Sequence, residues 1–230
     1  MLESGDPAKG SPLETPCSVR SLPACGRLQT DASLGALPPA GPRFQAMGQS
    51  PGLASCRVVA RPRLRHTPPV TLPPRIVALD DLAATEALGR AVAASLRPGD
   101  SVLLDGPLGA GKTTLARALL RAACRDPALE VPSPSYTLVQ EYDSPLGPIR
   151  HFDLWRLDGA AALEELGWDE AREGIVLVEW PDRLGALRPA DALRIALRIV
   201  VQPGGERRRA SLAGWGARLD AVLASTPRAA

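Results

Sequence analysis

The sequence predicts an α/β fold: a compact, mixed but mostly parallel sheet flanked by helices, with a disordered N-terminal extension. Three observations lead to this prediction. From residue 75 onward, short apolar runs alternate with segments of helical periodicity. A glycine-rich turn joins the apolar run at residues 101–105 to an amphipathic segment. Residues 1–74, in contrast, hold 13 of the 24 prolines and no steady apolar period, so they bury too little surface to offset their ordering entropy.

The folded part, residues 75–230, divides into expected elements in chain order. A strand at residues 75–79 leads to Asp80 or Asp81, either of which can cap a helix that runs to about Leu96. A buried strand at residues 101–105 is followed by the glycine-rich turn and a second helix. Further strands are expected at residues 136–142, 148–154 and 174–180, further helices at 161–171 and 214–224, and a terminal hairpin from the segments LRIALRIVV and RRRASLAGW.

Charge and cysteine content narrow the class of protein. Residues 1–74 carry 8 basic and 4 acidic residues, whereas residues 75–230 carry 19 and 21. A folded part so close to neutral is not typical of a dedicated nucleic-acid-binding protein, which usually has a basic stripe. Three of the four cysteines lie in the extension and no two form a CxxC pair, which argues against a zinc site and fits a reducing compartment.

The location that the sequence predicts is cytoplasmic. The chain has no run of 18 apolar residues and no apolar leader segment, so neither a membrane span nor a secretory signal is expected. Translation from a later methionine, for example Met47, is an alternative in which most of the extension is not made.

The glycine-rich turn, GPLGAGKT at residues 106–113, fits the pattern G-x-x-x-x-G-K-[ST] between a predicted strand and a predicted helix. Its glycines let successive backbone N–H groups converge on phosphate oxygens. Lys112 is one of only two lysines in a chain with 25 arginines. A compact ammonium fits the narrow loop and reaches the β- and γ-phosphates, whereas a planar guanidinium does not. Thr113 supplies a hydroxyl for Mg²⁺. The turn therefore predicts a P-loop NTPase-like fold.

Two acidic residues end apolar runs and are candidates for work at the phosphates. Glu179 closes IVLVE, in the Walker-B arrangement of a buried strand that delivers a carboxylate to the magnesium ion. Asp153 closes IRHFD. Either acid could instead cap a turn or pair with an arginine. His151 is a less favoured candidate for a general base, because a strand histidine beside an aromatic residue more often packs in the core.

These motifs and the blocks around them resemble one known family. The blocks GPLGAGKTT, SPSYTLVQEY, HFDLWRL, ELGWDE and LVEWPDRL occur in the order and spacing of the TsaE (YjeE) ATPases, over about residues 76–225. The resemblance implies a protein that binds ATP and Mg²⁺ and hydrolyses ATP. It also implies partners similar to TsaB and TsaD, which attach a threonylcarbamoyl group to a tRNA adenosine beside the anticodon, so that tRNA is involved indirectly.

The resemblance assigns roles to individual positions. Asp153 resembles the acid needed for hydrolysis, and Thr113 with Glu179 resembles the Mg²⁺ pair. Thr137 lies in a block that resembles a switch near the γ-phosphate. The resemblance also implies that six consecutive residues hold the phosphates: Gly109, Ala110, Gly111, Lys112, Thr113 and Thr114. It places Thr85 on the adenine side and Trp180 beside the nucleotide. Arg209 is a further candidate near the nucleotide, in a loose alignment.

The sequence departs from the family pattern at the rim of this site. Pro107 stands where the family usually has an acid, Ser135 and Tyr136 replace a Thr-Phe or Thr-Tyr pair, and Trp155 replaces a tyrosine. None of these changes removes a group that phosphate binding needs. Arg156 is a candidate for compensating phosphate charge or for a partner contact, although an ordinary ion pair is equally expected.

Two other functions are compatible with a phosphate-binding loop. A small-molecule kinase would need an arginine-rich lid, and none of the arginines between Leu115 and Glu179 lies in a loop insertion that reads as a lid. A binding module that uses nucleotide only as an assembly clamp would not need Asp153. The sequence favours an ATPase with slow turnover in the isolated chain, because it shows no obvious arginine finger.

Overall fold

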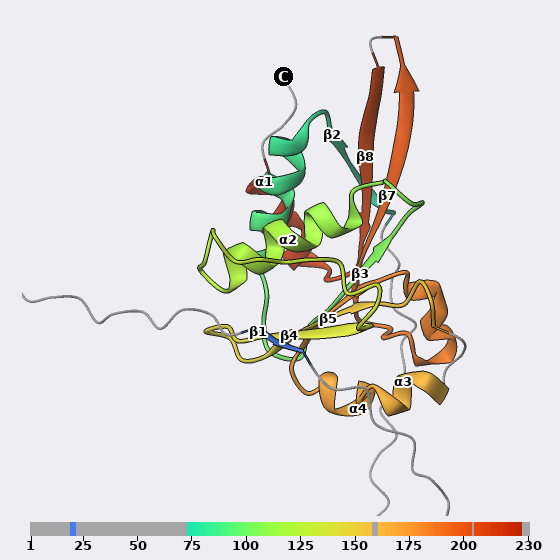
Figure 1. The fold of residues 1–230 in the computed structure, drawn as a ribbon. Helices are drawn as coiled ribbons and strands as arrows, with labels where there is room; N and C mark the ends of the chain where they lie inside the picture. Colours follow the sequence, from blue (N-terminus) through green and yellow to red (C-terminus); the bar gives the residue numbers. More distant parts are fainter. Residues whose placement is uncertain (1–18, 22–72, 158–160, 204, 227–230) are drawn as a thin grey trace, which may run out of the picture. The chain divides into compact units, whose positions relative to one another are not determined.

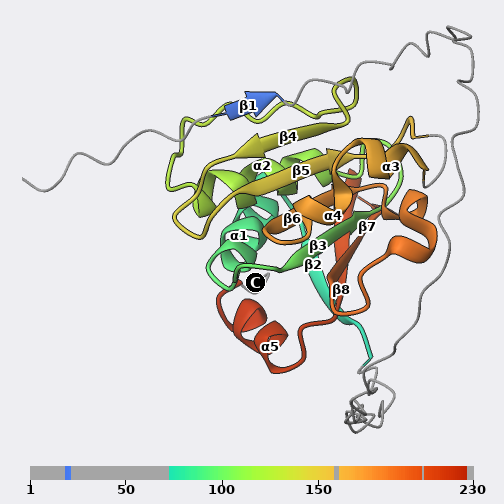
Figure 2. The ribbon, with the colours of Figure 1, turned by 90° about the horizontal axis from the view of Figure 1, so that it is seen from below.

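The computed structural model describes residues 19–21, 73–157, 161–203 and 205–226. Within these residues the strands form one sheet in the order β1-β4-β5-β6-β3-β7-β8-β2 (Figures 1 and 2). The strands are β1 Val19–Ser21, β2 Arg75–Leu79, β3 Ser101–Asp105, β4 Val139–Tyr142, β5 Ile149–Asp153, β6 Ile175–Glu179, β7 Leu193–Gln202 and β8 Gly205–Ala213. The expected disorder of the extension concerns residues that lie outside the described ones, apart from residues 73–74 and β1, which pairs with β4.

The sheet is mixed, as expected, but the parallel part is limited to its centre. β3 is parallel to both β6 and β7, and β6 is parallel to β5. The other described pairs, β1–β4, β4–β5, β7–β8 and β2–β8, are antiparallel. The expectation of mostly parallel pairing therefore holds only for the central strands. The short connections within the β4–β5 and β7–β8 hairpins allow only antiparallel pairing.

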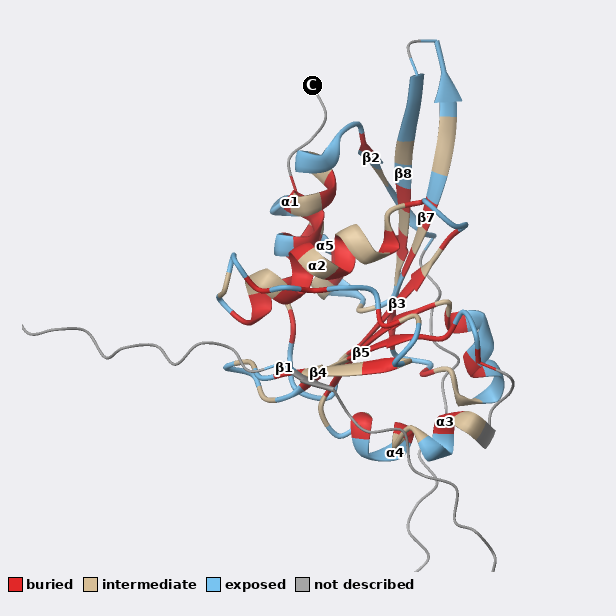
Figure 3. Ribbon diagram, viewed as in Figure 1, coloured by how far each residue is buried: buried red, intermediate tan, exposed pale blue. Residues whose placement is uncertain are grey.

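Helices cover both faces of the sheet, and the strands divide their side chains between two cores. The helices α1 (Leu82–Ala93), α2 (Lys112–Ala123) and α5 (Ala217–Ala224) pack on one face, and α3 (Ala161–Glu165) and α4 (Trp168–Ala171) lie on the other (Figure 1). In β3, Val102 and Leu104 join the first core and Leu103 joins the second. Burial on both faces explains why β3 and β6 read as continuous apolar runs (Figure 3).

Local sequence signals account for most element boundaries. Asp81 caps α1, as expected, since its Oδ1 accepts a hydrogen bond of 2.7 Å from the Ala84 N–H. β4 starts at Val139, three residues later than expected, because residues 135–137 form a turn. The expected helix at 161–171 is interrupted by Gly167, which has a φ of 68°. A 3₁₀ segment, Pro181–Leu187, follows β6 and was not expected.

Helices α1 and α2 are in close contact at Gly89. A Cβ atom at this position would lie 2.7 Å from the Cβ of Ala118 and 3.0 Å from the backbone nitrogen of Leu119. The missing side chain lets the two helices approach to backbone contact and fixes their relative position. Among the described residues, no helix combines the length and apolar character that a membrane crossing needs.

Candidate functional site

The glycine-rich turn forms a curled loop between the end of β3 and the start of α2. Gly109 and Gly111 have φ angles of 76° and 99°, in the left-handed region that glycine enters without strain. Gly106 passes so close to β7 that an added Cβ would lie 2.5 Å from the carbonyl oxygen of Leu197. The Ala110 N–H donates to the Pro107 carbonyl at 3.2 Å and closes the loop. Glycine is thus required at these positions for the loop to keep its shape.

The curled loop presents backbone donors at the N-terminus of α2. The first hydrogen bond of this helix runs from the Leu115 N–H to the Gly111 carbonyl, at 2.9 Å. The N–H groups of residues 111–114 consequently have no helical acceptor. Together with the positive end of the helix dipole, these donors suit a phosphate group.

Lys112 lies inside this loop rather than in solvent. It is 5% exposed, and its Nζ donates to the carbonyl oxygens of Gly106 at 2.8 Å and Pro107 at 3.0 Å. The ammonium also lies 3.8 Å from the centre of the Trp180 ring. Burial lowers the pKa of Lys112, and the negative charges of Glu179, Asp153 and Asp105 oppose this change. The site therefore holds a partly desolvated cation where an anion would enter.

Trp180 reaches Lys112 through an uncommon backbone conformation. Its φ of 60° and ψ of 54° are left-handed, which is costly for a bulky residue. This conformation turns the chain sharply at the end of β6 and directs the indole ring to the loop. Trp155, which follows β5, packs against the same ring, with the ring centres 4.3 Å apart and the ring planes inclined by 45°.

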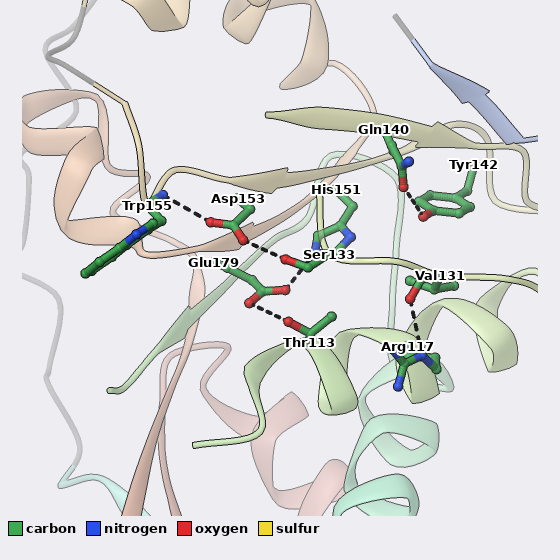
Figure 4. A network of polar contacts seen from close by, with 10 residues as sticks. All are labelled: Thr113, Arg117, Val131, Ser133, Gln140, Tyr142, His151, Asp153, Trp155 and Glu179. Carbon is green, nitrogen blue, oxygen red and sulfur yellow. Dashed lines mark hydrogen bonds and ion pairs between the residues drawn. The ribbon is translucent and has the colours of Figure 1, made fainter. Parts of the chain in front are cut away.

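Glu179 is held from two sides at the end of β6. The Thr113 hydroxyl donates to its Oε2 at 3.0 Å, and the Nε2 of His151 lies 3.1 Å from its Oε1 (Figure 4). Both His151 and Glu179 are buried, and the Nδ1 of His151 has no hydrogen-bond partner in the described residues. The two contacts fix the orientation of the carboxylate toward the hydroxyl of Thr113.

Asp153 lies on β5 beside Glu179, because the parallel register pairs these two residues directly. It is 4% exposed; its Oδ2 accepts a hydrogen bond of 2.7 Å from the Ser133 hydroxyl, and its Oδ1 accepts one of 3.0 Å from the Trp155 N–H (Figure 4). Two strand ends thus place two carboxylates at the same edge of the sheet, next to the loop.

These groups surround one cavity of about 440 Å³. Tyr136 is on its rim, where the Arg156 guanidinium stacks 4.5 Å from the centre of the phenol ring. The cavity is lined by residues of the loop, of the segment before β4, and of the ends of β5 and β6: Leu108, Gly109, Gly111, Lys112, Thr113, Thr114, Ser133, Ser135, Tyr136, Asp153, Trp155, Arg156, Glu179 and Trp180.

The donor set fits a nucleotide polyphosphate with Mg²⁺. The backbone N–H groups of the loop and the ammonium of Lys112 suit phosphate oxygens, whereas the Thr113 hydroxyl and the Glu179 carboxylate are the hard oxygen ligands that Mg²⁺ prefers. Among the described residues, no group of three or more metal-ligating side chains forms a cage of its own. The two oxygen-bearing side chains, Thr113 and Glu179, suit magnesium, which is usually held by one or two protein oxygens together with phosphates and water.

The cavity brings together most, but not all, of the residues selected from the sequence. Gly109, Gly111, Lys112, Thr113, Thr114, Asp153, Glu179 and Trp180 all line it. Ala110 is buried in the core beneath the loop. Thr85 is buried in α1, where its hydroxyl donates to the Asp81 carbonyl at 3.2 Å. Thr137 is exposed in the turn before β4 and does not line the cavity, unlike its neighbours Ser135 and Tyr136.

Arg209 and its neighbour Arg208 lie on opposite faces of β8, because successive side chains of a strand alternate. Arg208 is the residue near the loop: its Cδ lies 3.9 Å from the position that a Cβ of Gly111 would take. Arg208, Ser133 and Leu108 were not among the site residues that the sequence predicted. The alternation along β8 shows that the two arginines face opposite sides of the sheet. It does not show which of them faces the loop unless the direction of one side chain is known.

The comparisons with known proteins agree with this geometry. Residues 79–209, more than half of the chain, match the family described as "Threonylcarbamoyl adenosine biosynthesis protein TsaE". A tRNA threonylcarbamoyladenosine biosynthesis protein TsaE of Bacillus subtilis is 30% identical over 146 residues, which cover 63% of this chain and 88% of that protein. The protein of the same name from Rickettsia felis is 34% identical over 123 residues, covering 53% and 71%. The crystal structure of Bacillus subtilis YdiB superposes with a TM-score of 0.52 and 26% identity, covering 67% of this chain and 95% of that one.

The strand, curled loop and helix, set in a mixed sheet with two acids at its edge, define the class of P-loop α/β proteins. Within this class, the chain belongs to the TsaE family, whose role is threonylcarbamoyl adenosine biosynthesis.

Proposed function

We propose that this chain is a Mg²⁺-dependent protein that binds and hydrolyses ATP, and that it acts with TsaB-like and TsaD-like partner proteins in the threonylcarbamoyl modification of a tRNA adenosine beside the anticodon. The observation that carries the proposal is the hydrogen bond between Thr113 and Glu179 beside the buried Lys112, at the mouth of a curled loop. Membership of the TsaE family supports the pathway.

The residues of the cavity have separate roles in this proposal. The loop N–H groups and Lys112 bind the β- and γ-phosphates, and Thr113 and Glu179 hold Mg²⁺, which would neutralise phosphate charge. Asp153, 4% exposed and fixed by two hydrogen bonds, orients the attacking water or accepts its proton. The packed rings of Trp155 and Trp180 line one side of the cavity.

The cavity also supports the proposal of slow turnover by the isolated chain. Among the described residues, Arg156 is the arginine that lines the cavity, and its guanidinium stacks on Tyr136 at the rim. An arginine that stabilises the transferring phosphate must point to the γ-phosphate. A partner protein would therefore complete the site, either by supplying a charge or by redirecting Arg156.

Phosphate release, measured with and without the two purified partners, tests this function. We expect slow release by the chain alone and stimulation by the partners. In Asp153→Asn, release should fall about 100-fold or more while ATP affinity stays within about threefold, because a positioned acid or base contributes on the order of 10²–10⁴ to the rate. Ser133→Ala, which removes only one hydrogen bond to Asp153, is the control and should lose less. Unchanged release by Asp153→Asn would contradict the assigned role, and ATP binding without any release, even with both partners, would favour the assembly clamp.

A further inference from the structure

A second cavity, of about 720 Å³, lies between α1 and α2. We call it the helix groove. Leu82, Glu86 and Arg90 of α1 form one wall, and the other is formed by residues of α2 and the loop after it: Thr114, Arg117, Ala118, Arg121, Ala122, Arg125 and Pro127. The proposed nucleotide function uses none of these residues except Thr114, which also lines the cavity at the glycine-rich loop.

Three arginines form a row along the groove. Arg117, Arg121 and Arg125 are spaced by four residues and so share one side of α2 and its end. The Nε of Arg117 donates to the Val131 carbonyl at 3.2 Å (Figure 4), and the Nε of Arg121 donates to the Leu129 carbonyl at 2.9 Å. These bonds hold the two side chains in place and leave their terminal guanidinium nitrogens to other acceptors.

No carboxylate among the described residues lies within ion-pair distance of Arg117, Arg121 or Arg125. Arg90, on the other wall, is 3.7 Å from the groove's one lining acid, Glu86. The groove is therefore strongly positive, although residues 75–230 together carry more acidic than basic residues. This surface therefore attracts a negatively charged ligand.

The groove also has apolar surface, which distinguishes a protein occupant from a nucleic acid. The side chain of Leu82 is exposed, at 61%, and Ala118, Ala122 and Pro127 complete the apolar part. Among the described residues, the lining of the groove includes no aromatic ring, the side chain on which proteins most often stack the bases of single-stranded nucleic acid. The N-terminal extension is not a suitable occupant either, since it carries 8 basic and only 4 acidic residues.

The walls of the groove are fixed before anything binds. The contact at Gly89, where backbone meets backbone, prevents α1 and α2 from sliding past one another. The helical walls and the two arginines that are held by hydrogen bonds, Arg117 and Arg121, lose little conformational entropy on binding, whereas the exposed side chains of Arg90 and Arg125 must be ordered.

From these observations we propose that the helix groove is a docking site for an acidic, amphipathic segment of a partner protein. Carboxylates of the segment pair with Arg121, Arg125 and Arg90, and an apolar side chain packs on Leu82. This docking site rests on the proposed function in one respect: the partner proteins used to test it are the purified TsaB-like and TsaD-like proteins of the same organism.

The test compares two variants of the full chain that carry the same change in charge. The groove variant is Arg90→Glu with Arg125→Glu; both side chains are exposed, and neither forms a hydrogen bond with the backbone of the described residues. The control is Arg97→Glu with Arg194→Glu, two exposed arginines outside the groove. We expect the groove variant to bind the partner proteins at least about tenfold more weakly by calorimetry, and the control to stay within about twofold. Both variants should keep wild-type unfolding curves and ATP affinity.

Each of the other outcomes contradicts the proposed docking site or assigns the groove to a different ligand. Equal loss in both variants, or no loss in the groove variant, overturns the docking site while leaving the ATPase proposal intact. If the wild-type chain binds neither partner, the proposed function fails together with the docking site. Loss of ATP affinity in the groove variant would make the groove a part of the nucleotide site. Binding of purified tRNA that only the groove variant loses would assign the groove to nucleic acid, and a wild-type dimer that only the groove variant dissociates would assign it to a second copy.

Discussion

The hydroxyl of Thr113 donates a hydrogen bond of 3.0 Å to the carboxylate of Glu179, although 66 positions separate the two residues in the chain. The bond joins the first turn of α2 to the end of β6, the two elements that bring a P-loop and its acidic partner together. With His151 on the other carboxylate oxygen, Glu179 has one protein contact on each oxygen. This arrangement is formed by the protein alone, so magnesium would meet oriented ligands.

Removal of the Thr113 hydroxyl tests its role toward Mg²⁺. In Thr113→Val, which keeps the shape of the side chain, the Mg²⁺ concentration needed for half-maximal ATP binding should rise about tenfold or more, because one metal ligand is lost. Thr113→Ser keeps the hydroxyl and should behave like the wild type. Titration of Mg²⁺ against a fluorescent ATP analogue measures both. An unchanged Mg²⁺ requirement in Thr113→Val would remove this residue from the metal site.

Replacement of Lys112 tests the phosphate site. Lys112→Ala should lower ATP affinity by about 100-fold, because charge-assisted hydrogen bonds contribute about 1.5–3 kcal/mol each. The unfolding curve should change little, since the contacts of the ammonium with the described residues are those with two loop carbonyls and the face of Trp180. Calorimetry gives the affinity, and Arg194→Ala, an exposed cation elsewhere, is the control. Wild-type affinity in Lys112→Ala would refute the phosphate assignment.

The lowered pKa of Lys112 predicts how ATP affinity depends on pH. Only the protonated amine attracts phosphate, and burial lowers its pKa from the ordinary value of 10.5 in the free protein. Affinity should therefore fall as pH rises through this lowered pKa, at a less alkaline pH than an exposed lysine would give. Bound phosphate stabilises the protonated form, so binding in this range should take up protons. Lys112→Arg stays charged throughout and should lack the alkaline decrease, however weakly it binds.

Gly89 offers a test of the packing between α1 and α2. In Gly89→Ala the new methyl group would lie 2.7 Å from the Cβ of Ala118, so either helix must shift. We expect a net loss of about 1–2 kcal/mol in the free energy of unfolding, after the higher helix propensity of alanine is included. Urea unfolding measures this loss. The double variant Gly89→Ala with Ala118→Gly should recover part of it; if it does not, the backbone of Leu119 and not Ala118 limits the approach.

The sequence predicted the centre of this protein better than its edges. The spacing of Gly106, Gly111 and Lys112 specifies the loop because few backbones satisfy it, and Glu179 and Asp153 were selected because each ends an apolar run; the parallel register places both at the same edge of the sheet. The hairpin was predicted as well, but not which side chains face the loop, since a shift of one residue exchanges Arg208 and Arg209. The turn before β4, which brings Ser135 and Tyr136 to the cavity, and the 3₁₀ segment after β6 carry weak local signals, so the conformation of both depends on tertiary contacts.

Thr114 borders both the cavity at the loop and the helix groove. A molecule in either hollow would meet the same turn of α2. If the first ligand alters the position of Thr114, thermodynamic reciprocity requires that each ligand changes the affinity of the other by the same factor. The architecture of this domain thus gives two separate ligands a single shared residue, one position beyond the proposed magnesium ligand.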